Sequence, residues 1–175
     1  MGQWLADAGE PVEAGWDLRA VAGAEAGMTL ALESLTVPGD RVIVECPCYV
    51  GTLALLRAMG RIPVPVPVDR NGLDAERLAS TLQKEDAKLL VTVATFHNPT
   101  GVTYSRARRE RVLALTRAHG VPLVEDDTYG DLRFSGSRIP SFRMLPGAEH
   151  VVHVGSFSKS LAAGLRLGYV IAQEP

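Results

Sequence analysis

Lys159 stands among small, hydroxylated and basic residues that could do chemistry together. The stretch reads Gly155-Ser-Phe-Ser-Lys159-Ser, and Arg166 follows seven residues later. The chain has three lysines against fifteen arginines, so a lysine in this setting favours chemistry that arginine cannot do. An amine can lose its proton and attack a carbonyl carbon. Ser156, Ser158 and Arg166 add hydroxyl and guanidinium donors of the kind that hold a phosphate.

A lysine amine beside a phosphate-binding group is the pattern of a pyridoxal 5′-phosphate (PLP) Schiff-base site. The plainer alternative is an exposed lysine that follows a strand. The remaining candidate residues favour the cofactor, because they supply the other roles that such a site needs.

Asp126 and Tyr129 follow a short apolar run at residues 121–124. A carboxylate that faces a pyridine nitrogen keeps it protonated and makes the ring an electron sink, and a nearby tyrosine hydroxyl can share the 3′-oxygen. One alternative is that acidic residues end a strand in solvent. Another is a glycosidase carboxylate pair among Glu125, Asp126 and Asp127. Adjacent strand residues point to opposite faces, which argues against that pair.

Three further motifs each have an ordinary structural alternative. Asn98 could donate its amide to a phenolate oxygen, although Asn98-Pro-Thr-Gly also suits a plain turn. Tyr49 could stack on a flat ring, or be an ordinary core or surface tyrosine. The segment Gly23-Ala-Glu opens a predicted helix, whose free N–H groups and dipole attract an anion. Glycine-rich helix starts also serve close packing alone.

The pattern of apolar runs predicts strands that alternate with helices. Strands are expected at residues 18–22, 41–45, 62–68, 89–95, 121–124, 151–154 and 167–172, and helices at 3–8, 23–35, 49–59, 74–82 and 105–119. This alternation predicts an α/β fold with three layers, α/β/α, around a mostly parallel sheet. Prolines at every second position of 62–68 place that strand at a sheet edge. The candidate residues follow strands, so they should meet at the carboxyl edge of the sheet.

Composition narrows the class of protein. With 175 residues, a net charge of −2 and scattered basic residues, the chain favours one domain and no nucleic-acid partner. The densest basic group, Arg106 to Arg111, is expected to form a solvated helix face. No apolar run is long enough to span a membrane, and the N-terminus lacks the features of a signal peptide. Cys46 and Cys48 are too close for an ordinary disulfide, which favours a reducing, cytoplasmic setting. A metal site at these cysteines would need further ligands, for which His97 is the one candidate, and we expect no metal site.

The ordered motifs resemble the class I/II aminotransferases of PLP fold type I over residues 18–172. The motifs are Gly23-Ala-Glu, Pro47-x-Tyr49, Asn98-Pro-Thr-Gly101, Asp126-x-x-Tyr129, Ser156-x-Ser-Lys159 and Gly164-x-Arg166-x-Gly168. The chain is most similar to the aminoadipate and aromatic aminotransferase branch, which includes aminotransferase-like domains fused to winged-helix regulators. Ala163 departs from the family, which often has proline there.

The resemblance implies a role for each candidate. Lys159 would form the Schiff base and move the proton, Asp126 would pair with the pyridine nitrogen, and Asn98 with Tyr129 would hold the 3′-oxygen. Tyr49 would stack on the ring. The phosphate would be held by the backbone N–H groups of Ala24 and Glu25 together with Ser156, Ser158 and Arg166. The resemblance also implies amino acid and 2-oxo acid substrates and a homodimer in the full-length form.

The chain is about half the length of family members. We therefore expect residues 1–175 to be a partial large, PLP-binding domain that lacks the family's small domain and its carboxylate-binding arginine. Three hypotheses stay open. The chain could be an aminotransferase, a PLP-binding effector domain of a transcriptional regulator, or an inactive fragment of a PLP enzyme. Lyases share the same apparatus, so the fold does not fix the reaction.

Overall fold

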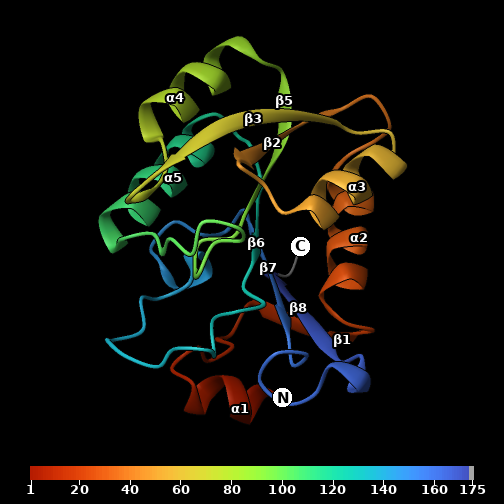
Figure 1. Ribbon diagram of the computed structural model, residues 1–175, viewed down its shortest axis with the longest axis vertical. Coiled ribbons are helices and arrows are strands. Elements are labelled where there is room, and N and C mark those ends of the chain that lie inside the picture. The colour runs from red at the N-terminus through yellow and green to blue at the C-terminus, as the bar shows by residue number, and fades with distance from the viewer. Residues whose placement is uncertain (174–175) are drawn as a thin grey trace.

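A single sheet of eight strands organises the computed structural model, which describes residues 1–173 (Figure 1). The strands are β1 Trp16–Val21, β2 Arg41–Cys46, β3 Ile62–Asp69, β4 Gly72–Leu73, β5 Ala87–Thr92, β6 Leu123–Asp126, β7 Val151–Ser156 and β8 Gly168–Gln173. The helices are α1 Gly2–Asp7, α2 Ala24–Leu35, α3 Val50–Ala58, α4 Ala75–Lys84 and α5 Arg106–Ala118, with short 3₁₀ turns η1 Phe142–Met144 and η2 Ala163–Leu165.

The sheet is mostly parallel, as the sequence predicts. Its order is β1-β8-β7-β6-β5-β2-β3-β4. β3, β2, β5, β6 and β7 pair in parallel, and β1 points the same way because it is antiparallel to β8, which is antiparallel to β7. β8 runs backwards because residues 157–167 contain no α-helix that could carry the chain across the sheet for a parallel return.

Helices cover both faces and make the predicted three layers. α2 and α3 lie on one face and α4 and α5 on the other, while α1 packs at the end near β1 and β8 (Figure 1). Successive side chains along a strand point to opposite faces of the sheet, so each strand contributes to a hydrophobic core on each face. On β2, Val42 and Val44 join the α2/α3 core, whereas Ile43 between them joins the α4/α5 core.

The proline-rich strand β3 lies at the edge of the sheet, as predicted. It pairs with β2 along its length, and its outer side meets only the two-residue strand β4, at Val68 and Asp69. The backbone of Pro67 faces away from β2, because its carbonyl oxygen accepts from the Asp74 N–H, at 2.8 Å, on the outer side of β3. Prolines at the outward positions remove N–H donors that would otherwise invite another strand.

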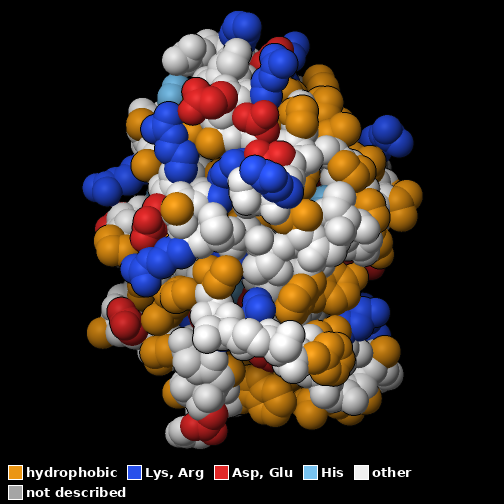
Figure 2. Space-filling view, turned by 60° about the vertical axis from the view of Figure 1, so that its left-hand side comes forward, with side chains coloured by type: hydrophobic (Ala, Val, Ile, Leu, Met, Phe, Trp, Pro, Cys, Tyr) orange, Lys and Arg blue, Asp and Glu red, His pale blue; other side chains and the backbone are white. Residues whose placement is uncertain are grey.

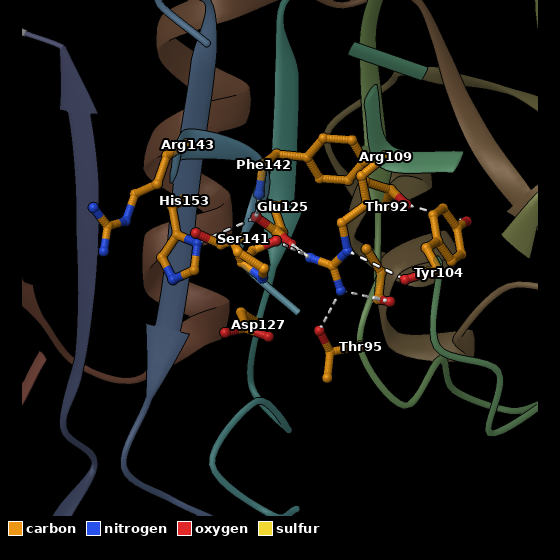
Figure 3. A network of polar contacts seen from close by, with 12 residues as sticks. Thr92, Thr95, Tyr104, Arg109, Glu125, Asp127, Ser141, Phe142, Arg143 and His153 are labelled. Atoms are coloured by element: carbon orange, nitrogen blue, oxygen red, sulfur yellow. Dashed lines mark hydrogen bonds and ion pairs between the residues drawn. The ribbon is translucent and has the colours of Figure 1, made fainter. Parts of the chain in front are cut away.

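The expectation of a solvated basic face on α5 is wrong for Arg109. Its side chain is fully buried and forms an ion pair with Glu125 of β6, Nη1 to Oε1, at 2.9 Å. The guanidinium also donates to Thr95 Oγ1 at 2.7 Å and to the Ala94 carbonyl at 3.0 Å (Figure 3). A buried charge is tolerated only when it is paired and hydrogen-bonded, and Arg109 meets both conditions.

Charged side chains of both signs lie on the face that Figure 2 shows. Acidic and basic side chains lie next to one another over its upper part, and hydrophobic side chains gather along its right-hand side and in its lower part. Within residues 1–173 no helix combines the length and the apolar character needed to cross a bilayer. The same residues contain no group of three or more His, Cys, Asp or Glu side chains placed to hold a metal ion.

Removing the buried guanidinium should be far more harmful than removing an exposed one on the same helix. We expect Arg109→Met to lower the free energy of unfolding by about 3–5 kcal/mol, because Glu125 is left buried without its cation. The matched control is Arg106→Met, whose exposed pair with Glu110 should be worth no more than about 0.5 kcal/mol. Urea unfolding of both variants measures the difference, and equal losses would contradict the buried pair's importance.

Candidate functional site

A cavity of about 270 Å³ opens at the carboxyl edge of the sheet and collects all ten residues that the sequence singled out. Its wall includes Ala24, Glu25, Tyr49, Asn98, Asp126, Tyr129, Ser156, Ser158, Lys159 and Arg166. The topology explains the convergence, since β1, β2, β5, β6 and β7 end at this edge and the reversed β8 begins there. The roles assigned to these residues remain predictions.

One end of the cavity is built around the start of α2. Gly23 is the helix N-cap, with φ at 93°, and the Arg166 guanidinium lies against it. A Cβ at residue 23 would come within 2.8 Å of Arg166 Nη2, and one at Gly168 would come within 3.0 Å of the Ala24 nitrogen. The absence of side chains at both glycines therefore lets Arg166 and the start of β8 approach the first residues of α2 closely, and Arg166 adds a positive charge there. This end suits a phosphate.

Lys159 reaches the cavity from the turn that follows β7. Phe157 anchors this turn, because its buried ring packs edge-on against Trp4 and contacts Tyr169. The Phe157 carbonyl then accepts from the N–H of Leu161 at 2.9 Å, which closes the turn around Lys159. The lysine side chain itself is exposed to solvent, so its amine is accessible to a carbonyl compound in the cavity.

Asp126 ends β6 and is half-buried in the cavity wall. Its Oδ1 accepts from Thr128 Oγ1 at 2.6 Å and from the Thr128 N–H at 3.1 Å. Burial raises the pKa of Asp126 above its usual value, and the hydrogen bonds from Thr128 oppose that rise. The carboxyl group is therefore partly shielded from water, and a cationic partner at this position would favour its ionised form.

Asn98 and Tyr129 come from neighbouring strand ends and touch each other. Asn98 Nδ2 donates to Tyr129 Oη at 3.2 Å. His97, which precedes Asn98, is buried with Nε2 3.1 Å from Glu45 Oε2 and Nδ1 2.7 Å from Thr100 Oγ1. Buried polar contacts therefore fix the loop that carries Asn98, and they place its amide and the phenol side by side.

Tyr49 lies at the cavity mouth, at the N-cap position of α3, and is 43% exposed. Its ring lies over Gly51, where any side chain would collide with it. The exposed face of the ring is consistent with the predicted stacking on a flat ligand.

The acidic residues on either side of Asp126 turn away from the cavity, as strand alternation requires. Glu125 pairs with Arg109 and accepts from the Phe142 N–H at 2.8 Å, with His153 Nδ1 at 3.4 Å (Figure 3). Burial alone would raise the pKa of Glu125, but His153 and Arg109 outweigh it and hold that pKa below its usual value. Glu125 and Asp126 thus face opposite sides of the sheet and cannot flank one glycosidic bond, as expected from the sequence.

Several residues that line the cavity were missed in the sequence. They are Met28, Gly51, Thr52, Leu55, Val93, Thr128 and Ala163. Met28 and Leu55 are ordinary helix residues, and Val93 directly follows β5, so nothing in the sequence marks these three. The backbone contact of Thr128 could have been expected, because an aspartate often accepts from the N–H two residues later in a turn, but the bond from its hydroxyl could not.

The donors around the cavity fit PLP. A helix start, two serines and an arginine in the cavity wall match the phosphate, while a carboxylate and an accessible amine lie in the same wall. The fold and the site together define a PLP-type α/β large domain.

Comparison with known proteins identifies the family. The model of aminotransferase class I and II matches residues 18–175, so the chain belongs to that family. It is 42% identical over 153 residues to the HTH-type transcriptional regulator TauR of Rhodobacter capsulatus, covering 87% of this chain and 31% of TauR. It is 32% identical to aromatic-amino-acid aminotransferase 1 of Thermococcus litoralis, covering 90% of this chain and 39% of that enzyme.

The fold also matches solved aminotransferases. The structure of Pyrococcus horikoshii kynurenine aminotransferase in complex with PMP superimposes with a TM-score of 0.89 at 32% identity, covering 97% of this chain and 43% of that one. The chain thus spans less than half the length of these three relatives.

Asp127 should make the fold less stable as pH rises toward neutrality. Burial raises its pKa to about 7, with His153 lowering it and Glu125 raising it. A folded-state pKa above the ordinary value means that the folded chain binds the extra proton, so this contribution is lost as pH rises from about 4 to about 7. The pKa of His153 is also raised, because Glu125 outweighs burial, and it acts in the same direction.

Replacing Asp127 by asparagine should therefore flatten the pH dependence. We expect the free energy of unfolding to fall less between pH 5 and pH 8 in Asp127→Asn than in the unmodified chain, with the part due to His153 retained. Urea unfolding at several pH values measures this, with the exposed Asp86→Asn variant as control. An unchanged slope in Asp127→Asn would show that Asp127 is ionised throughout this range.

Proposed function

We propose that this chain is part of the large domain of a PLP-dependent aminotransferase, which moves an amino group between an amino acid and a 2-oxo acid. The observation that carries the proposal is the meeting of Lys159, Asp126 and the start of α2 in one cavity. The family match and the aminotransferases among the relatives support it. The homodimer, which the family resemblance implies, and the cytoplasmic setting, which the two cysteines favour, belong to the same proposal.

When bound, PLP supplies a carbonyl carbon that condenses with amines and a ring that accepts electrons. The residues of this chain would orient it and move protons. The phosphate would be held by Arg166, Ser156, Ser158 and the N–H groups at the start of α2, as the place of these residues in one cavity wall and the contact of Arg166 with Gly23 suggest.

At the other end of the cofactor, the ionised Asp126 would accept a hydrogen bond from the protonated pyridine nitrogen. Asn98 and Tyr129, already in contact, would share the 3′-oxygen. Tyr49 would cover one face of the ring. Lys159 would bind the cofactor and, once displaced by substrate, its amine would take the proton from the substrate's α-carbon and deliver it to the former carbonyl carbon of the cofactor.

A second candidate function is a PLP-binding effector domain in a transcriptional regulator. The 42% identity to TauR favours it. An assay for amino-group transfer distinguishes the two candidate functions. Transfer to a 2-oxo acid by the full-length protein supports the enzyme, whereas PLP binding without turnover, together with a DNA-binding segment encoded beside this chain, supports the regulator.

Lys159 should be the residue that PLP modifies. After incubation with PLP and reduction with borohydride, we expect one phosphopyridoxyl group on the peptide that contains Lys159. The other two lysines, Lys84 and Lys88, lie on α4 and β5 away from the cavity and serve as internal controls. Mass spectrometry of the digest locates the group. Labelling of Lys84 or Lys88 in preference to Lys159, or full labelling of a Lys159→Ala variant, would refute the assignment.

Asp126 should bind the cofactor through its charge. We expect Asp126→Asn to raise the dissociation constant of PLP about tenfold or more, because a hydrogen bond between charged groups is worth about 1.5–3 kcal/mol. Titration of the chain with PLP, followed by absorbance, measures the constant, and the distant Asp86→Asn variant should bind as the unmodified chain does. Equal affinity in Asp126→Asn would argue against a pairing with the ring nitrogen.

A further inference from the structure

Thr128 is a cavity residue that the proposed roles leave without a function. Its hydroxyl and its backbone N–H both donate to the same atom, Asp126 Oδ1, at 2.6 Å and 3.1 Å. Both donors belong to the residue two positions after Asp126, so the turn that follows β6 holds the carboxylate by itself. We call this pair of hydrogen bonds the clamp. The clamp holds one oxygen and fixes the rotation of the carboxyl group.

The second oxygen of Asp126 is left for a ligand. Among residues 1–173 no donor bonds to Oδ2, and the half-buried carboxyl lines the cavity. No arginine or lysine of the described chain pairs with Asp126 either, in contrast to Glu125, whose cation is Arg109. The charged groups that act on Asp126 are Glu45, which opposes its ionisation, and His153, which favours it.

Thr128 is therefore the main local support for a negative charge at Asp126. Burial works against that charge, and the two hydrogen bonds from Thr128 are the strongest influences in its favour. Hydrogen bonds to an ionised group are worth more than bonds between neutral groups, so losing the shorter of the two should be measurable.

We propose that Thr128 is a positioning residue, whose hydroxyl holds Asp126 Oδ1 so that the carboxylate stays ionised and presents Oδ2 to the pyridine nitrogen of PLP. This inference rests on the proposed function, because it names the residue that prepares the carboxylate for that cofactor. A purely structural role would instead have Thr128 stabilise the turn after β6 without affecting the ionisation of Asp126.

Three substitutions separate these roles. Thr128→Val removes the hydroxyl but keeps the β-branched shape and the backbone N–H donor, and Thr128→Ala removes the hydroxyl in a smaller side chain. Thr128→Ser keeps the hydroxyl. The matched control is Thr116→Val, which removes a buried hydroxyl that bonds to carbonyls of α5, on the opposite face of the sheet from α2.

The first measurement needs no cofactor. Carbon-13 NMR of labelled aspartate carboxyls, with the Asp126 signal assigned by its absence in Asp126→Asn, follows the pKa of Asp126 in the cofactor-free chain. We expect that pKa to rise in Thr128→Val and Thr128→Ala and to stay at the unmodified value in Thr128→Ser and Thr116→Val. An unchanged pKa in both hydroxyl-free variants, or an equal rise in Thr128→Ser, would overturn the inference.

The second measurement is PLP affinity. We expect the dissociation constant to increase about tenfold in Thr128→Val and to return toward the unmodified value in Thr128→Ser. Equal PLP affinity in Thr128→Val and the unmodified chain would also overturn the inference. Failure of the unmodified chain to take up PLP would contradict the proposed function, and it is distinguished from failure of the inference by the carboxyl pKa, which is read without cofactor.

Discussion

The buried ion pair between Arg109 and Glu125 is the interaction on which the geometry of the cavity depends. It ties α5 to β6 through side chains that are both fully buried. Successive residues of a strand face opposite sides, so fixing Glu125 in the α4/α5 layer directs Asp126 into the cavity on the other side. One strand thereby supplies a structural carboxylate and a candidate cofactor-binding carboxylate at adjacent positions.

The same edge of the sheet gathers the other candidates because of strand direction. Lys159 follows β7, Asn98 follows β5, and the N-cap Gly23 follows β1. The reversed strand β8 brings Arg166 to this edge from the opposite chain direction, and the close approach of Gly168 to Ala24 brings the start of α2 beside it. Residues more than 130 positions apart in the chain thus meet around one cavity.

Much of the fold and the membership of the site could be predicted from the sequence. Apolar runs such as 151–154 mark buried strands, alternating prolines mark an edge strand, and motif residues that follow parallel strands must share one end of the sheet. The burial of Arg109 could not be predicted, because its partner Glu125 is sixteen residues away and only the packing of α5 on β6 joins them. The part played by Thr128 depends on which oxygen of Asp126 it reaches, and spacing alone does not determine that.

The central claim is that one amine and one carboxylate approach opposite ends of a single cofactor. A crystal structure of the chain with PLP tests it most directly. The account predicts continuous electron density from Lys159 Nζ to the cofactor, with Asp126 Oδ2 at hydrogen-bonding distance from the pyridine nitrogen and the phosphate at the start of α2. Density joined to another lysine, or a ring nitrogen that faces away from Asp126, would contradict it.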